Sequence, residues 1–327
     1  MEYSEKGIRM EQAYFGPFWR FLKSPKITDI DYNGSELWIT EVENERYPVI
    51  EHGITDKFIE QFPEADVSIV HESVAVSGRS VCIRKSLPKM RLSVESALRE
   101  EYCQKEVLAL LINCVLSKMN MVFCGEPGCG KTECAKFFSQ FIPAHERVIT
   151  IEDNPEWHYS RINPGKDCVE LRICGDFDYT KAIKTCLRQN PAWIMLSEAR
   201  SVEVKSLLEC WSTGIRGFTT LHTDDVRKIP DRILNMMESR YDANRLENDV
   251  YSYVDVGVLL RRRKKTDGRV YRYMDQLCFF TREQGINMVS MLVWDGKLEK
   301  FKIPEGVRKI MSRYGIEEPF NNREVRG

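Results

Sequence analysis

The chain has 327 residues, and its 48 lysines and arginines balance 49 aspartates and glutamates, giving a formal net charge of −1 at pH 7. This length suggests two domains of roughly 100–200 residues, and the balance of charge does not favour a nucleic-acid ligand, which usually requires a basic surplus. The 11 cysteines are dispersed, with no cluster at zinc-ligand spacing, as is typical of reduced thiols in a cytosolic protein. No apolar run is long enough to predict a membrane span or a signal peptide.

The N-terminal part, residues 1–90, is predicted to be a small α+β domain. Short strands are predicted at 37–40, 67–70, 74–76 and 80–84, the last two forming a hairpin around a Ser-Gly turn. A short helix is predicted at 55–62. We expect residues 91–100 to form a linker, in which Ser93 caps the helix that enters the next domain.

The remainder, residues 101–327, shows helices that alternate with strands and ends in a strand-rich extension. Helices are predicted at 101–118, 132–141, 179–188, 202–211, 226–237 and 307–314. Strands are predicted at 121–124, 148–151, 193–196, 218–221 and 254–260, followed by short strand-like segments over 270–300. This alternation predicts an α/β fold with a largely parallel, doubly wound sheet. The basic run 261–265 is interpreted as a solvated hairpin loop.

The segment from Gly125 to Thr132 fits the phosphate-binding pattern G-x-x-x-x-G-K-[ST] in full. The candidate nucleotide-binding residues are Gly125, Glu126, Pro127, Gly128, Cys129, Gly130, Lys131, Thr132 and the following Glu133. Glycines let backbone N–H groups turn inward around phosphate oxygens, and the helix that follows directs its positive end at the same anion. Lys131 would reach the β and γ phosphates, and Thr132 would ligate Mg²⁺. The motif follows an apolar strand and opens a helix, so it predicts a site for ATP and Mg²⁺.

Acidic residues follow two predicted strands, at the edge where open α/β sheets bind ligands. Glu152 and Asp153 end one strand, with Glu156 just beyond, and Glu198 ends another. A P-loop site needs such acids to hold Mg²⁺ or to polarise the attacking water. We therefore predict catalytic roles for Glu152, Glu156 and Glu198, and metal binding by Thr132, Asp153 and Glu198. Each acid alone also fits a solvated charge or a helix cap.

His222 ends the strand predicted at 218–221. A single histidine at a strand end is commonly a structural group. Its position one strand after Glu198 also suits a catalytic role, in which it would sense or hydrogen-bond the γ-phosphate.

Four segments, in order along the chain, together resemble the motifs of a known family. They are GEPGCGKT, ITIEDNPEW, LRQNPAWIMLSEAR and TGIRGFTTLHTDD. They resemble the Walker A motif, Asp box, Walker B motif and His box of the type II/IV secretion, or traffic, ATPases. The nearest branch is that of the CpaF-like and type IV secretion and conjugation ATPases. The resemblance is strong over residues 84–225 and weak in the N-terminal part.

This resemblance implies a RecA-like P-loop domain and a homo-hexameric ring in which ATP hydrolysis drives domain motion. The ring would power secretion, conjugation or pilus assembly from the cytoplasmic side, through an inner-membrane platform or a secretion-channel protein, with only peripheral contact to the membrane. It also implies catalytic roles for four arginines. Arg200 falls in the Walker B motif, Arg84 would act from the N-terminal domain, and Arg172 and Arg188 would reach a neighbouring subunit's phosphate.

Some positions depart from the family pattern. Ser197 and Ser201 replace usual glycines, and Glu133 replaces a hydroxyl residue. These changes indicate a divergent branch that keeps Lys131 and Glu198. Two alternatives stay open: a RecA-like helicase or nucleic-acid translocase, and a nucleotide-binding scaffold that does not turn over.

Overall fold

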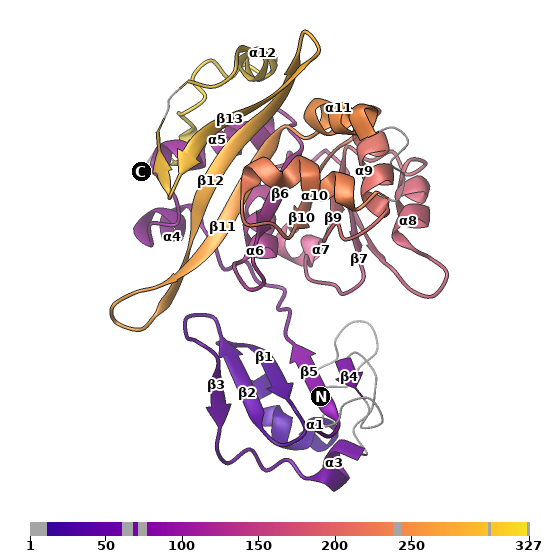
Figure 1. Cartoon of the computed structure of the whole chain (residues 1–327), viewed down its shortest axis with the longest axis vertical. Helices are drawn as coiled ribbons and strands as arrows, with labels where there is room; N and C mark the ends of the chain where they lie inside the picture. Colours follow the sequence, from indigo (N-terminus) through magenta and orange to yellow (C-terminus); the bar gives the residue numbers. More distant parts are fainter. Residues whose placement is uncertain (1–11, 61–67, 71–76, 238–242, 300–301, 326–327) are drawn as a thin grey trace. The chain divides into compact units, whose positions relative to one another are not determined.

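The computed structural model describes residues 12–60, 68–70, 77–237, 243–299 and 302–325 (Figure 1). The chain divides into two compact units. The first comprises Met1–Ser86 with Arg263–Tyr271, and the second comprises Leu87–Arg262 with Arg272–Gly327. All 11 cysteines are free thiols. Within the described ranges, no helix combines the length and the apolar character that a membrane span needs.

The first unit is built on an antiparallel five-stranded sheet in the order β3-β2-β1-β5-β4. Its strands are β1 (Ile27–Tyr32), β2 (Leu37–Glu41), β3 (Tyr47–Val49), β4 (Ser68–Val70) and β5 (Ser80–Arg84). Its helices are α1 (Gln12–Phe15), η1 (Gly16–Phe18), α2 (Trp19–Leu22) and α3 (Asp56–Glu60). The strands predicted at 37–40 and 80–84 are confirmed, whereas β1 and β3 were not predicted. The strand expected at 74–76 lies outside the described residues.

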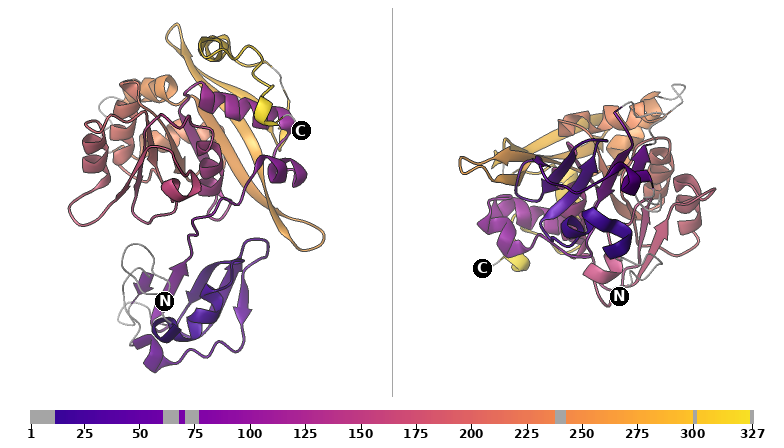
Figure 2. Two further views of the ribbon diagram at one scale, coloured as in Figure 1. Left: turned by 180° about the vertical axis from the view of Figure 1, so that it is seen from behind. Right: turned by 90° about the horizontal axis from the view of Figure 1, so that it is seen from below.

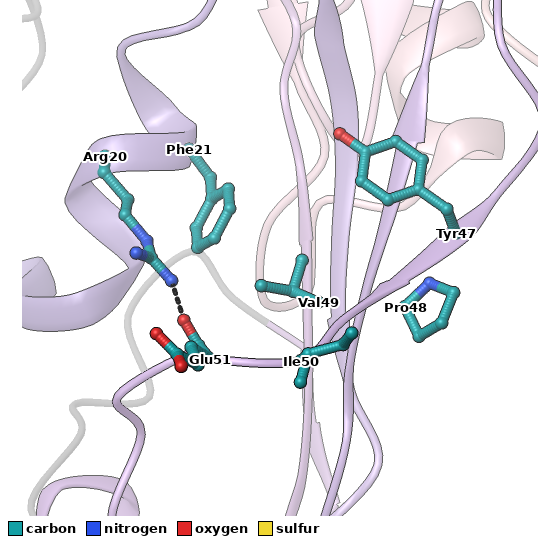
Figure 3. Close-up of a pocket in the computed structure, with 7 residues that line it drawn as sticks. All are labelled: Arg20, Phe21, Tyr47, Pro48, Val49, Ile50 and Glu51. Carbon is teal, nitrogen blue, oxygen red and sulfur yellow. Dashed lines mark hydrogen bonds between the residues drawn. The ribbon is translucent and has the colours of Figure 1, made fainter.

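A pocket of about 540 Å³ lies in this first unit (Figure 3). It is lined by Arg20, Phe21, Tyr47, Pro48, Val49, Ile50 and Glu51. Most of the lining is apolar, Ile50 is 95% exposed, and the Arg20 guanidinium donates a hydrogen bond to the carbonyl of Glu51. None of the predicted site residues lines it.

The second unit is built on a nine-stranded sheet in the order β14-β13-β12-β11-β6-β10-β9-β7-β8. Its strands are β6 (Met121–Gly125), β7 (Val148–Glu152), β8 (Cys168–Arg172), β9 (Trp193–Leu196), β10 (Arg216–Leu221), β11 (Val256–Lys264), β12 (Val270–Glu283), β13 (Ile286–Trp294) and β14 (Lys297–Leu298). The six strands from β11 to β8 pair in parallel. β13 pairs antiparallel with both β12 and β14. The predicted largely parallel sheet is therefore confirmed.

The helices of this unit connect the strands in the expected alternation. They are α4 (Val94–Arg99), α5 (Lys105–Leu116), α6 (Lys131–Ser139), α7 (Tyr159–Ile162), α8 (Tyr179–Cys186), α9 (Glu203–Ser212), η2 (Val226–Lys228), α10 (Ile229–Asn235), α11 (Ala243–Tyr253), α12 (Glu305–Arg313) and η3 (Arg323–Val325). Ser93 accepts a hydrogen bond from the Ser96 backbone and caps α4, as predicted. Two expectations were wrong. The helix predicted at 101–118 begins only at Lys105, and the segments expected to be short after residue 270 include β12, a strand of 14 residues.

The alternation of side chains along β6 separates two cores. Met121 and Phe123 face a core shared with α5 and α6, while Val122 and Cys124 face one shared with α8 to α11. Helices therefore cover both faces of the sheet, as the two opposite views show (Figures 1 and 2). Because a parallel sheet covered on both faces needs apolar side chains at every position, all five residues of β6 are buried.

Gly217 in β10 tests how closely the central strands approach one another. A Cβ added there would lie 2.0 Å from the carbonyl oxygen of Ile194 and 2.8 Å from Trp211 Nε1. Gly217→Ala should therefore force β9 and β10 apart and lower the free energy of unfolding by about 1–3 kcal/mol or more. Gly306→Ala is the matched control, because its Cβ would meet only the end of the flexible Glu283 side chain. Equal urea midpoints for the two variants would contradict this packing.

Candidate functional site

The P-loop joins β6 to α6, and its glycines adopt backbone conformations that other residues avoid. Gly125, Gly128 and Gly130 have φ angles of +140°, +77° and +93°. A Cβ at Gly125 would lie 2.4 Å from the carbonyl oxygen of Leu260 on β11, so that position accepts only glycine. Gly130 directly precedes α6, whose first backbone N–H groups therefore point towards the loop. The loop therefore has the glycine turn and the helix start that the sequence predicted, and phosphate binding stays a prediction.

Lys131 is the first residue of α6, and its side chain folds back into the loop. The residue is 9% exposed, and Nζ donates to the carbonyl oxygens of Gly125 at 3.2 Å and Glu126 at 3.3 Å. Nζ also lies 3.3 Å from His222 Nδ1. The phosphate oxygens of a nucleotide would offer this ammonium stronger, charge-assisted acceptors than these neutral groups.

His222, at the end of β10, links the lysine to Glu198. Its Nε2 lies 2.9 Å from Glu198 Oε1. Burial and then the Lys131 charge lower the pKa of His222, which favours the neutral ring. In that ring Nδ1 accepts from Lys131, and Nε2–H donates to Glu198.

Glu198 and Asp153 are joined by Arg200. The guanidinium Nε of Arg200 donates to Glu198 Oε2 at 2.9 Å, and its Nη1 donates to Asp153 Oδ2 at 2.8 Å. The N–H of Asn154 and the charge of Arg200 lower the pKa of Asp153 despite the opposing effect of burial. The side chains of Lys131, His222, Glu198, Arg200 and Asp153 form a continuous series, called the ionic chain below. It crosses the carboxyl ends of β6, β10, β9 and β7.

Two other predicted site residues, Glu156 and Glu133, pair with residues outside the ionic chain. Thr132 donates its hydroxyl proton to Glu156 Oε2 at 3.1 Å, while Glu133 pairs with Lys136 at 3.1 Å. Of the three predicted metal ligands, the structure places Thr132 against Glu156, whereas Asp153 and Glu198 share Arg200. In the described part of the chain, no three His, Cys, Asp or Glu side chains are arranged to hold a metal ion.

Glu152 faces its own loop. It is 3% exposed, and its Oε1 accepts hydrogen bonds from the backbone N–H groups of Glu156 and Trp157, both at 3.0 Å. Burial raises the pKa of this carboxyl to about 8. In this position Glu152 fixes the loop that carries Asp153 and Glu156.

Three predicted arginines lie outside the ionic chain. Arg84 ends β5 in the first unit and pairs with Asp29 at 2.9 Å. Arg172 is exposed at the end of β8, beside Glu152 in the strand register. Arg188 follows α8, next to Gln189, whose carbonyl bonds to Arg147 just before β7 begins. This places Arg188 at the amino edge of the sheet, whereas the P-loop follows β6 at the carboxyl edge.

Two further arginines, which were not predicted as site residues, lie against the P-loop. Arg272 Nε donates to the carbonyl oxygen of Gly128 at 3.0 Å, and Arg262 Nη1 would lie 3.6 Å from a Cβ at Gly128. The interpretation of 261–265 as a solvated loop was wrong for its first part, because β11 continues to Lys264 and Arg261 pairs with Asp275 at 2.7 Å. The available signal was a basic run that directly follows a buried strand.

The buried Glu152 carboxyl predicts a pH-dependent stability. Because its pKa rises from 4.5 to about 8 on folding, the folded state keeps a proton that the unfolded state releases within this range. The free energy of unfolding therefore rises as the pH falls from about 8 to 4.5, by up to roughly 1.4 kcal/mol per pH unit, because the folded state binds the Glu152 proton more tightly. Glu152→Gln keeps an acceptor for both amides and removes the titration. Its unfolding free energy relative to wild type should therefore rise from about pH 5 to 8.

Urea unfolding at several pH values measures this difference. The exposed Glu209→Gln in α9 is the control, and its difference from wild type should stay flat across the same range. A flat difference for Glu152→Gln as well would show that this carboxyl is ionised in the folded state.

Residues 58–278 match the family described as Type II/IV secretion system protein. An uncharacterised protein of Bacillus anthracis is 29% identical over 309 residues, which cover 84% of this chain and 69% of that protein. Type IV secretion system protein VirB11 of Bartonella quintana is 27% identical over 180 residues, 52% of this chain and 50% of VirB11. The chain thus matches about half of the VirB11 sequence. The X-ray structure of the Yersinia pseudotuberculosis ATPase DotB is similar in fold, with a TM-score of 0.60 at 15% identity, over 85% of this chain and 81% of that one.

The family match covers more than half of the chain, from α3 to β12, and it includes the P-loop and the whole ionic chain. The mainly parallel sheet and the likeness to DotB confirm the predicted RecA-like α/β fold. The chain is a member of the Type II/IV secretion system protein family.

Proposed function

We propose that this chain binds ATP at its P-loop and hydrolyses it, as one subunit of a homo-hexameric motor. The motor would power a type IV secretion, conjugation or pilus-assembly machine from the cytoplasmic side, through a protein partner in the inner membrane. The observation that carries this proposal is the ionic chain, because it brings the P-loop lysine into one network with the acids of two neighbouring strand ends. Membership of the family supports the same assignment.

In this proposal Lys131 exchanges its carbonyl partners for the β and γ phosphates, whose negative charge it stabilises. The backbone N–H groups of the P-loop surround the same phosphates. The Thr132 hydroxyl, now bonded to Glu156, is an oxygen donor of the kind that Mg²⁺ prefers, and carboxylates of the site would complete its shell directly or through water. Bound Mg²⁺ would neutralise charge that develops on the phosphates.

Glu198 is the proposed residue that orients and polarises the attacking water. Its two oxygens are held by different groups, Oε1 by His222 and Oε2 by Arg200. This fixes the plane of the carboxylate, and movement of His222 with Lys131 would free one oxygen for water. His222 is thereby placed to report the presence of a γ-phosphate to Glu198.

The ring part of the proposal concerns one arginine of the first unit and two of the second, none of which belongs to the ionic chain. Arg84, Arg172 and Arg188 are proposed to supply charge across a domain or subunit boundary, which would make hydrolysis depend on closure. Heterologous interfaces between identical subunits form a closed ring when the rotation from each subunit to the next adds up to a full turn. The proposed hexamer would be a ring of this kind.

Lys131→Ala and Glu198→Gln should separate binding from hydrolysis. Lys131→Ala removes the phosphate contact, so turnover should vanish and ATP binding should weaken at least about tenfold. Glu198→Gln keeps the shape of the side chain but loses the carboxylate, so ATP should bind and hydrolysis should fall roughly 10²–10⁴-fold. Phosphate release and equilibrium binding measure the two effects. Lys184→Ala and Glu209→Gln, both exposed, serve as matched controls.

Wild-type turnover in Lys131→Ala would refute the P-loop assignment. Loss of binding in Glu198→Gln would show that Glu198 is a structural residue. Turnover that rises steeply on addition of DNA would favour the alternative of a nucleic-acid translocase.

The oligomeric state tests the ring separately. Light scattering at micromolar protein should give a hexamer, favoured by a non-hydrolysable ATP analogue. A strict monomer with full ATPase activity under both conditions would refute the ring and leave the nucleotide site standing.

A further inference from the structure

The antiparallel pair β11 and β12 carries two arginines to the glycine turn of the P-loop. In the parallel register Leu260 of β11 lies beside Gly125, and β11 then continues past the end of β6. Arg262 Nη1 would stand 3.6 Å from a Cβ at Gly128, and the Arg272 side chain would lie 3.2 Å from a Cβ at Gly130. Arg272 is fixed there by its hydrogen bond to the carbonyl of Gly128.

The charges of these arginines are only partly compensated. Arg261, the neighbour of Arg262, is engaged by Asp275 and by the carbonyl of Asp224. The side chain of Arg262 is exposed and makes no hydrogen bond or ion pair with any residue that the structure describes. Burial, followed by the charges of Arg262 and Arg91, lowers the pKa of Arg272. Several like charges thus converge on a loop whose geometry already suits an anion.

The order of the strands decides which part of a nucleotide these arginines would meet. His222, Glu198 and Asp153 follow β10, β9 and β7, which all lie on one side of β6. β11 and β12 lie on the other side, as Figure 1 shows. A triphosphate whose γ end faces Glu198 and His222 must direct its base end towards β11 and β12.

We infer that Arg262 and Arg272 bind the base-side phosphates of a nucleoside di- or triphosphate, and so set the affinity for ADP and ATP alike. This inference rests on the proposed function and adds residues to the same site. A guanidinium offers paired N–H donors that match phosphate oxygens. Phosphates that ATP and ADP share are bound equally before and after hydrolysis, so such contacts contribute uniform binding and do not accelerate the chemical step.

Calorimetric titration with ADP, ATP analogue and inorganic pyrophosphate tests the inference. Arg262→Ala should weaken all three by a similar factor, about ten- to hundredfold, the worth of a hydrogen bond to a charged group. The KM for ATP should rise with it, while kcat at saturation should change less than about threefold. Arg262→Lys should recover part of the affinity. Arg272→Gln, which keeps a donor for the Gly128 carbonyl, should act in the same direction as Arg262→Ala.

The control is Arg269→Ala, which removes the same charge from the turn between β11 and β12, where Arg269 pairs with Asp267. It should bind ADP like wild type. Unchanged ADP affinity in Arg262→Ala, or a fall in kcat alone, would overturn the inference while the proposed function stands. A loss confined to nucleotides, with pyrophosphate unaffected, would also overturn it, because the contact would then be to the base or sugar. A wild-type chain that binds no nucleotide would instead refute the proposed function.

Discussion

The parallel pairing of β11, β6, β10, β9 and β7 is the constraint on which the rest of the site depends. In a parallel sheet every strand delivers its carboxyl end to the same edge, so residues far apart in sequence arrive as neighbours. Here the P-loop follows β6, His222 follows β10, and Glu198 follows β9. The order of the strands also divides this edge. Acids and the histidine lie on one side of the P-loop, and the β11–β12 arginines lie on the other.

The charged groups of the ionic chain are held in place by one another and by backbone carbonyls. Lys131 is held by neutral carbonyls and a neutral imidazole, and each oxygen of Glu198 contacts a different donor. Lys131 contacts His222, and His222 contacts Glu198. A phosphate that moved Lys131 would therefore also change the position of His222 and, through it, that of Glu198.

Much of this site could be predicted from sequence, because its signals are local. The P-loop is a continuous motif, and Glu198 and His222 each end an apolar run, which predicts a strand and therefore a position at the common edge. The role of Glu152 could not be predicted, since whether a carboxyl at a strand end faces the ligand or its own loop depends on the turn that follows. Arg262 and Arg272 were missed for a different reason. Their approach to Gly128 depends on how far β11 and β12 extend beyond β6, and a basic run beside a turn is most often solvated. In the first unit, Asp29 and Asp31 of β1 alternate with the buried Ile30 and Tyr32, a pattern that favours a strand, but a register shift between Ile27 and Asp29 interrupts the alternation, and β1 was missed.

The most direct test of this account is a crystal structure of the wild-type chain with Mg²⁺ and a non-hydrolysable ATP analogue. The account predicts that the phosphates lie in the glycine turn, that Lys131 Nζ leaves the carbonyl oxygens of Gly125 and Glu126 for the β and γ phosphates, and that the base points towards β11 and β12. An analogue bound elsewhere, with Lys131 still on those two carbonyls, would contradict it.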